Sequence, residues 1–330
     1  MVETGYPLAV LAIALILDYC IGDPWNWVHP VQVIGWWISR FSQMALKWIE
    51  HPLALKMTGI ILGLSTILGT GLVGGLLIKT AQGVHPLLGF MADSILLASC
   101  FAGRSLRDAA TNVLAPLQRY QLTTAREKMA LYVGRDTQDL DESELLRAIL
   151  ETVTENATDG VLAPLFYAIL SVFLNLAIPI GIAPLVLAYK AASTLDSMVG
   201  YKTPPYTDLG WFSARLEDYL TWIPCRLVVA TIALLSGKPQ SVWQICQRDA
   251  PLDPSPNAGW SECAYAAALG VQLGGVNLYK GVKKEKPLLG DRLYPLTPDH
   301  VAQALHLTRW SILTWVVITI LMIGPFLGHS

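Results

Sequence analysis

The chain has 330 residues, of which 53% are hydrophobic and only 15% are charged. Soluble proteins carry about a quarter charged residues, so this composition nearly excludes a soluble two-domain enzyme and indicates a membrane protein. The net charge of −2 and the pI near 6.3 provide no basic excess that could neutralise phosphates, so we expect no nucleic-acid partner.

Long apolar runs predict an all-α polytopic integral membrane protein with about four to six transmembrane helices, because roughly 20 apolar residues in a helix cross the hydrocarbon core. We expect a single membrane-embedded catalytic domain over residues 1–330. The runs at residues 7–21 and 86–101 each contain a carboxylate, Asp18 and Asp93, which should point away from lipid. The predicted spans are residues 7–21, 58–78, 86–101, 161–189 and 309–327.

Two apolar segments are irregular. The second half of 161–189 contains Asn175, Pro179, Gly181 and Pro184, where a continuous helix would lose backbone hydrogen bonds. This pattern predicts a helical hairpin or a broken helix. The run at 223–236 is shorter than a span and predicts a re-entrant or interfacial helix, not a crossing.

The distribution of Lys and Arg predicts the orientation. The first six residues contain no Lys or Arg, whereas segments 102–160 and 237–308 contain seven each. Because basic residues concentrate on the cytoplasmic side, we expect the N-terminus outside and segments 102–160, 190–222 and 237–308 inside. The protein is therefore expected in the cytoplasmic membrane, with its active site on the cytoplasmic side.

The two basic segments differ in their local pattern. Segment 102–160 has apolar residues at helical spacing over 104–117 and 123–133, and Asp141 with Glu144 has the spacing of a capping box. Segment 250–300 is dense in Pro, Gly and Asn and predicts loops around one short helix at 262–269, with no sustained strand. Long ordered loops beside a membrane are usually functional.

The densest polar motif begins at Glu151. Glu155 and Asp159 follow at i+4 and i+8, which places three carboxylates along one helical face. Like charges at this spacing repel, so the pattern predicts a nearby cation, either Arg side chains or a divalent metal such as Mg²⁺. An acidic, solvated helix face is the alternative interpretation.

Two arginines follow glycines, at Gly103-Arg104-Ser105 and at Gly134-Arg135-Asp136-Thr137. Glycine allows a phosphate to approach the backbone, and Arg binds it through a bidentate fork. Membrane anchoring by Arg104 and a helix C-cap at Gly134 are the alternatives. A third polar motif, residues 194–202, combines Asp196, two hydroxyls and Lys202, but its residue order does not match a hydrolase triad.

These motifs, taken together and in order, resemble one known family, the membrane-bound adenosylcobinamide-phosphate synthases of cobalamin biosynthesis. The resemblance runs from about residue 15 to residue 292. It rests on Leu17-Asp18, Gly22-Asp23-Pro24, His29-Pro30-Val31, Gly103-Arg104-Ser105-Leu106, Val133 to Thr137, Glu151 to Pro164, Thr194 to Lys202, Pro254 to Trp260, and Leu273-Gly274-Gly275 with Asn277, Tyr279 and Gly281.

The resemblance implies an ATP- and Mg²⁺-dependent carbon–nitrogen ligase. Such an enzyme couples aminopropanol or its O-phosphate to a propionate carboxyl of adenosylcobyric acid. The corrinoid is a substrate, so no tightly bound prosthetic group is expected. Besides these substrates, the expected partners are the lipid bilayer and other late enzymes of the cobalamin pathway.

The resemblance gives positions, and the chemistry of an acyl-phosphate reaction suggests their roles. Glu151, Glu155 and Asp159 are assigned to Mg²⁺ or the amine. Catalytic roles are assigned to Glu151, Glu155, Asp196 and Lys202, the last two acting on the reacting carboxylate. Phosphate binding is assigned to Arg104, Ser105, Arg135, Asp136 and Thr137. Substrate binding is assigned to Asn156, Ser197, Tyr201, Asn257, Trp260, Asn277 and Tyr279.

Three positions depart from the family pattern, namely Ser193, the pair Glu217-Asp218, and Thr221. We do not assign catalytic roles to them. A transporter or sensor that binds its ligand without reacting it is the alternative function, because inward-facing acids and broken helices are common in transporters.

Overall fold

The computed structural model describes residues 5–22, 29–175 and 177–327. The Asp23-Pro24 part of the resemblance lies outside these residues. The chain is mainly helical, as predicted, and the described residues contain five helical stretches long and apolar enough to cross a membrane. These stretches are Pro52–Val84, Pro86–Gln118, Glu142–Asn175, Trp211–Leu235 and Pro298–Gly324, with Gly5–Cys20 as a shorter apolar helix. The all-α polytopic membrane fold is therefore confirmed.

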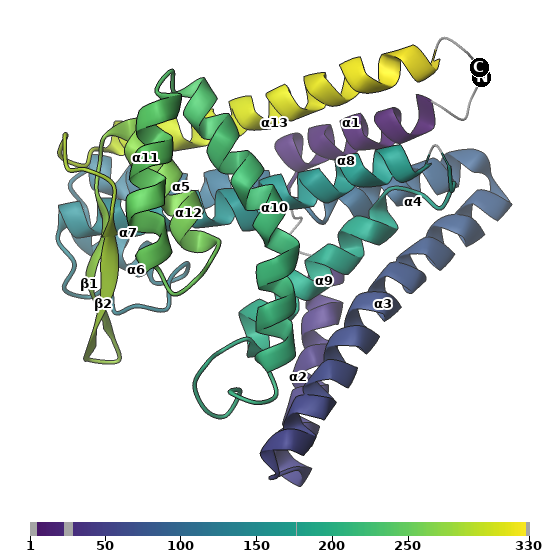
Figure 1. Ribbon diagram of the computed structural model, residues 1–330, viewed down its shortest axis with the longest axis horizontal. Coiled ribbons are helices and arrows are strands. Elements are labelled where there is room, and N and C mark those ends of the chain that lie inside the picture. The colour runs from purple at the N-terminus through teal and green to yellow at the C-terminus, as the bar shows by residue number, and fades with distance from the viewer. Residues whose placement is uncertain (1–4, 23–28, 176, 328–330) are drawn as a thin grey trace. The chain divides into compact units, whose positions relative to one another are not determined.

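The chain divides into two compact units. Unit 1 comprises residues 1–104, 163–221 and 316–330, and unit 2 comprises residues 105–162 and 222–315. The helices in chain order (Figure 1) are α1 (Gly5–Cys20), α2 (Pro30–Trp48), α3 (Pro52–Val84), α4 (Pro86–Ala98), α5 (Gly103–Gln118), α6 (Leu122–Met129), α7 (Glu142–Ala157), the π-helix η1 (Thr158–Leu162), α8 (Ala163–Asn175), α9 (Ala183–Val199), α10 (Trp211–Leu235), α11 (Pro239–Asp249), the 3₁₀ turn η2 (Ala250–Leu252), α12 (Ala258–Leu269) and α13 (Pro298–Leu327).

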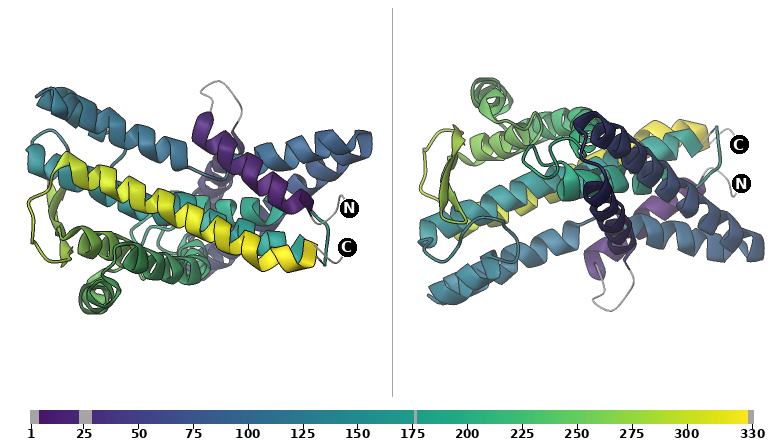
Figure 2. Two further views of the ribbon diagram at one scale, coloured as in Figure 1. Left: turned by 90° about the horizontal axis from the view of Figure 1, so that it is seen from above. Right: turned by 90° about the horizontal axis from the view of Figure 1, so that it is seen from below.

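In unit 1 the long helix α3 packs along α9 (Figure 1). Glycines make the close approach possible, because a Cβ at Gly74 would overlap the Leu187 side chain of α9 and one at Gly71 would lie 3.1 Å from the Pro184 carbonyl oxygen. Nearer its start, α3 also lies against the segment before α10, where a Cβ at Gly59 would overlap the carbonyl oxygen of Leu209. Helix α2 completes this packing, and α1 lies against α4 (Figure 2). The apolar core of this region consists of Ile34, Ile38, Leu62, Ala191, Leu195 and Val199.

The predicted break in segment 161–189 is confirmed. Helix α8 ends at Asn175, and α9 begins at Ala183. The side chain of Asn175 donates to the Gly181 carbonyl at 2.8 Å and accepts from the Gly181 amide at 3.3 Å. The buried Asp93 carboxylate accepts from the Ile182 and Ala183 amides at the start of α9, at 3.0 and 2.8 Å. The polar groups that the break exposes therefore have protein partners, as a lipid environment requires.

One further local prediction holds and two are corrected. Asp141 and Glu144 form the capping box that opens α7. Segment 250–300 is not only loops, because it contains an antiparallel hairpin of β1 (Leu273–Tyr279) and β2 (Val282–Leu289). The run at 223–236 is part of the 25-residue helix α10, so the predicted short separate helix is wrong. The charged residues of the first half of α10 interrupt the apolar pattern and conceal the length of the helix.

We predict that Gly59→Ala destabilises the protein and that Gly69→Ala does not. The new methyl group at position 59 would overlap backbone, which cannot move as a flexible side chain can, and overpacking of this kind costs about 1–3 kcal/mol. A Cβ at Gly69, in the same helix, meets nothing within 4 Å. Thermal unfolding in detergent measures the difference, and equal melting temperatures would contradict the tight α3 packing.

Candidate functional site

In unit 2, Glu151 on α7 is a buried carboxylate with two cationic partners. Its side chain is bound by two arginines, because Arg135 pairs with Oε2 and Arg147 donates to Oε1 at 3.1 Å. The backbone amide of Gly274 donates to the same Oε1 at 2.9 Å. Glu151 is only 1% exposed, so these donors replace the water that an ionised carboxylate would otherwise need.

The two arginines continue the network to β1. The Asn277 side-chain oxygen accepts from Arg135 at 2.8 Å and from Arg147 at 3.0 Å, and the Gly274 carbonyl accepts from Arg147 at 2.7 Å. Gly274 lies at a bulge in the hairpin with φ +85°, where a Cβ would overlap the Pro287 carbonyl. The Gly-Gly sequence is therefore required for the backbone to reach both partners.

The motif at residues 134–137 connects α6 to the hairpin. The Asp136 carboxylate accepts from the amides of Lys280 and Gly281 at the hairpin turn, at 3.0 and 2.7 Å. The Thr137 hydroxyl donates to the Arg126 carbonyl at 3.1 Å. In this structure Arg135, Asp136 and Thr137 thus all bind protein groups, although the sequence suggested phosphate.

The acidic motif does not remain on one regular helical face. After Glu155 the helix becomes the π-helix η1, and Asp159 lies within it. The Ser261 hydroxyl of α12 donates to the Thr154 carbonyl at 2.6 Å and pairs with the Thr158 hydroxyl at 2.6 Å. A side chain that takes a backbone carbonyl in this way interrupts the regular hydrogen bonds of the α-helix. Short π-helical segments such as η1 occur frequently at functional sites.

Half-buried Glu155 belongs to a second cluster that the sequence analysis missed. The Lys286 ammonium of β2 lies 3.3 Å from Glu262 Oε1, and Glu262 is 0% exposed. Glu155, Glu151 and Asp253 also interact electrostatically with this pair. Burial lowers the pKa of Lys286, but the surrounding carboxylates raise it by more, so its net pKa is above the usual value. In the sequence, the one feature that points to Glu262 is that it follows the motif ending at Trp260 by two residues.

Asn257 and Trp260, predicted to bind substrate, surround Arg226. The Arg226 guanidinium donates to Asn257 Oδ1 at 3.2 Å and lies over the rings of Trp222 and Trp260, 5.1 and 4.5 Å from their centres. Asn257 is buried. Arg226 is a further residue that the sequence analysis missed.

The remaining predicted binding residues of unit 2 differ in exposure. Asn156 is exposed and donates to the Thr152 carbonyl of its own helix at 2.8 Å. The ring of Tyr279 lies 5.5 Å from the Lys284 ammonium. Ser105 is half-buried near the start of α5.

In unit 1 the structure brings together motifs that are distant in sequence. The Asp18 carboxylate accepts from the Arg104 amide at 3.4 Å, and the Arg104 side chain donates to the Cys20 carbonyl at 3.0 Å. Gly22, with φ +66°, lies directly against the Arg104 side chain. The Asp18, Gly22 and Arg104 motifs are therefore in contact in the fold.

Asp196 lies at the end of α9, with exposed Ser197, Tyr201 and Lys202 following it. Burial, and then the negative charge of Asp218, raise the pKa of Asp196 to about 6, while Lys202 lowers it. A Cβ at Gly200 would overlap the Asp196 carboxylate.

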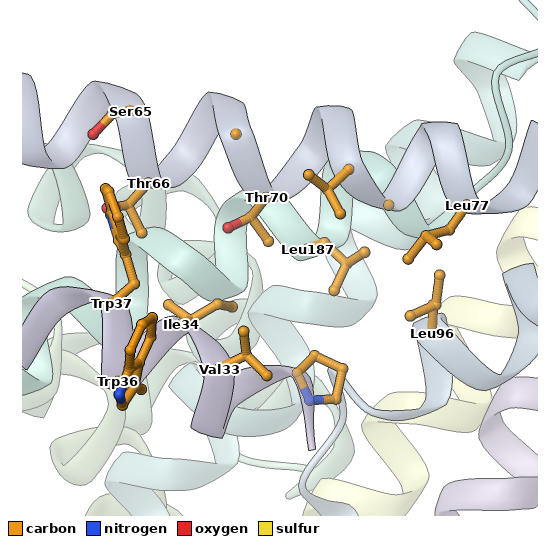
Figure 3. Close-up of a pocket in the computed structure, with 14 residues that line it drawn as sticks. Val33, Ile34, Trp36, Trp37, Ser65, Thr66, Thr70, Leu77, Leu96 and Leu187 are labelled. Atoms are coloured by element: carbon orange, nitrogen blue, oxygen red, sulfur yellow. The ribbon is translucent and has the colours of Figure 1, made fainter. Parts of the chain in front are cut away.

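Unit 1 also contains an apolar cavity of about 470 Å³ among α2, α3, α4 and α9 (Figure 3). Trp36 and Trp37 lie at one end, and Leu77 and Leu96 at the other. Apart from the indoles of Trp36 and Trp37, its polar side chains are hydroxyls, and those of Ser65 and Thr66 donate to the Leu62 carbonyl. No predicted site residue lines it, so charged chemistry is not located here.

Residues 11–308 match a family model described as CobD/Cbib protein. Among the curated relatives, the cobalamin biosynthesis protein CobD of Synechocystis is 52% identical over 94% of this chain and 90% of its own length. The cobalamin biosynthesis protein CbiB of Salmonella typhimurium is 38% identical over 89% and 91% of the two chains, and CobD of Halalkalibacterium halodurans 37% over 94% and 95%. No solved structure matches the chain.

We predict that Glu151→Gln lowers the stability of the fold, whereas Glu155→Gln leaves it nearly unchanged. Removing one partner of a buried ion pair leaves an unpaired charge and costs about 3–5 kcal/mol, and here two arginines lose their partner. Half-buried Glu155 should change the unfolding free energy by about 1 kcal/mol or less. Melting temperatures of the purified variants test this, and an unchanged melting temperature for Glu151→Gln would contradict the structural role.

A pH dependence follows from Glu262. Burial, followed by the effect of the nearby carboxylates, raises its pKa from 4.5 to about 8, although Lys286 lowers it. The folded protein therefore binds this proton more tightly than the unfolded chain, so the stabilisation is complete below pH 4.5 and is lost as the pH rises through about 8.

We expect the melting temperature of wild type to fall more between about pH 5 and about pH 9 than that of Glu262→Gln, which cannot lose the proton. The Asp196 contribution is present in both proteins and cancels in the difference. Parallel pH profiles would show that Glu262 ionises normally in the folded state.

Proposed function

Because the chain belongs to the CobD/Cbib protein family, we propose that it acts in cobalamin biosynthesis as an enzyme that forms an amide bond. The proposed reaction joins aminopropanol or its O-phosphate to a propionate carboxyl of adenosylcobyric acid and consumes ATP. The family match over nearly the whole chain and the names of the relatives support the pathway. The reaction itself rests on the sequence resemblance and on the chemistry of the charged residues.

One observation carries the proposal. Three segments of the resemblance, separated by up to about 140 residues, supply side chains or backbone to one charged region of unit 2: residues 133–137, 151–162 and 273–281. Arg135, Glu151, Gly274 and Asn277 are in direct contact. The Glu151 network is paired, but next to it Glu155 and Glu262 interact unfavourably, and Glu262 Oε2 has no hydrogen-bond partner among the described residues. Buried charge that is not fully paired costs stability, which favours a functional reason for it.

The proposed chemistry has two steps. A propionate oxygen attacks the γ-phosphorus of ATP, which forms an acyl phosphate and releases ADP. The amine nitrogen then attacks the carbonyl carbon, the C–N bond forms, and the C–O bond to phosphate breaks. The substrate ammonium loses one proton before the attack and a second proton after it. We propose that Glu155 is the carboxylate that receives one of them.

Mg²⁺ is proposed as the ion that accompanies ATP, but the three-carboxylate set expected from spacing does not fit a metal. Both Glu151 oxygens accept bonds from arginines or the Gly274 amide, and Asp159 lies in the π-turn. Within the described part of the chain, no three His, Cys, Asp or Glu side chains are grouped to hold an ion. We therefore assign no step to a metal held by these residues.

Substrate-binding roles are proposed for residues of each unit. In unit 1, Asp196 with Lys202 is proposed to bind a carboxylate substrate, and Arg104 to bind phosphate. In unit 2, buried Asn257 and the ring of Trp260 are proposed to contact the amide groups of the corrin. We also propose that the reaction takes place on the cytoplasmic side, where the basic segments are expected.

The experiment is product formation by purified protein. Wild type incubated with adenosylcobyric acid, aminopropanol phosphate, ATP and Mg²⁺ should yield the amide, identified by mass spectrometry. Glu155→Gln should remain folded and lose about two or more orders of magnitude in rate, as expected for a general base. Glu142→Gln is the matched control, because this exposed acid starts the same helix.

A transporter or sensor that does not react its ligand would give no ATP-dependent product. Full activity of Glu155→Gln would remove that residue from the mechanism but leave the reaction in place. Absence of product from wild type, with all substrates present and the protein folded, would reject the ligase proposal itself.

A further inference from the structure

Glu262 is a buried acid with an unmatched oxygen. Its side chain is 0% exposed, and Lys286 Nζ lies 3.3 Å from Oε1. Its other oxygen, Oε2, has no hydrogen-bond partner among the described residues. Buried carboxylate oxygens are nearly always hydrogen-bonded, because leaving one without a donor costs free energy. An acceptor left in this state indicates that a donor outside the described protein groups belongs there.

The surroundings of Glu262 specify the charge of that donor. Glu151 and Glu155 of α7 and Asp253 near the start of α12 interact with it unfavourably, and Lys286 of β2 interacts favourably. Arg135 and Arg147 are already bound to Glu151. With every group ionised, four carboxylates would face three cations, so a cationic ligand would stabilise the ionised form of Glu262, which burial and the neighbouring acids otherwise disfavour.

One side of this cluster reaches the protein surface, although Glu262 Oε2 itself is buried. The Lys286 side chain is 31% exposed, and Glu155 is only half-buried, so the cluster is not sealed on all sides. The π-turn η1 begins three residues after Glu155 and is opened by Ser261, which comes directly before Glu262 in α12. Ser261, which contacts the irregular backbone, and Glu262, which carries the unmatched oxygen, are therefore adjacent residues of α12.

The chemistry favours an organic ammonium over a divalent metal. Mg²⁺ requires near-octahedral oxygen ligands, and the repulsion from the lysine ammonium within the cluster is about twice as large for a divalent ion as for a monovalent ammonium. An ammonium carries several N–H donors and can bind two carboxylates at once, as Lys286 itself does electrostatically in this cluster.

We propose that Glu262, together with Glu155, binds the primary ammonium group of a small amine through the unmatched Oε2. This inference rests on the proposed function and names the residues that bind the amine that becomes the amide nitrogen. Lys286 then acts as a positioning residue, because it holds Oε1 and directs Oε2 toward the ligand. The competing interpretation is a purely structural ion pair between Lys286 and Glu262.

Amine binding without the other substrates tests the inference. The full-length protein in detergent is titrated with 1-amino-2-propanol and, separately, with propane-1,2-diol, which replaces the ammonium by a hydroxyl. Isothermal calorimetry or ligand-dependent melting gives the affinities. We expect wild type to bind the amine at least about ten-fold more tightly than the diol, because a charge-assisted hydrogen bond is lost in the diol.

Glu262→Gln should remove this preference, and Glu285→Gln should retain it. Glu285 is an exposed acid of the same hairpin, next to Lys286, so the control repeats the substitution close to the site. If Glu262→Gln does not fold, Glu155→Gln gives the second variant, for which the preference should also fall. Equal affinities for amine and diol in wild type, or an unchanged preference in a folded Glu262→Gln, would overturn the inference.

Kinetics separates this inference from the proposed function. In the ligation assay, Glu262→Gln should raise the KM for the amine by about ten-fold or more and leave the KM for ATP nearly unchanged. Product from wild type combined with unchanged amine KM in Glu262→Gln would reject the amine site and keep the ligase. Selective amine binding without any product from wild type would reject the ligase and keep the amine site.

Discussion

Unit 2 depends on the burial of one carboxylate, Glu151. An ionised group at 1% exposure is tolerated only because Arg135, Arg147 and the Gly274 amide supply its hydrogen bonds. Each donor comes from a different part of the chain, so the single charge determines where the loop before α7 and the bulge of β1 must lie. Asn277 then joins the two arginines on the strand side.

In unit 1 a buried carboxylate, Asp93, also needs hydrogen-bond donors, and uncharged groups supply them. Asp93 is fully buried in an apolar helix, and it accepts hydrogen bonds from the first amides of α9 and from the Tyr6 hydroxyl at 3.3 Å. The amides at a helix start have no partner within the helix and stabilise negative charge. The broken helix and the buried acid therefore satisfy each other, and neither requires a transported ion as explanation.

The parts of the structure that could be predicted are those set by nearby residues. The capping box follows from the spacing of Asp141 and Glu144, about three residues apart. The break after Asn175 follows from the prolines and the glycine that come next in the chain. The hairpin could not be predicted in this way, because Gly274, Gly275 and Pro287 suggest a loop until the partner strand is known. The pair of Glu262 and Lys286 depends on the strand direction and on the packing of α12, so no local pattern indicates it.

The acidic motif shows why spacing alone does not determine the surroundings of its side chains. Three acids at i, i+4 and i+8 share a face only while the helix is regular, and Ser261 ends that regularity by taking the Thr154 carbonyl. Glu151 is then neutralised by two arginines, and Glu155 interacts electrostatically with Lys286 and Glu262 as well. The repulsion expected from the sequence is real, but side chains from α12 and β2 determine how it is relieved. Both oxygens of Glu151 are therefore bound within the protein, whereas the charge of Glu155 is only partly compensated.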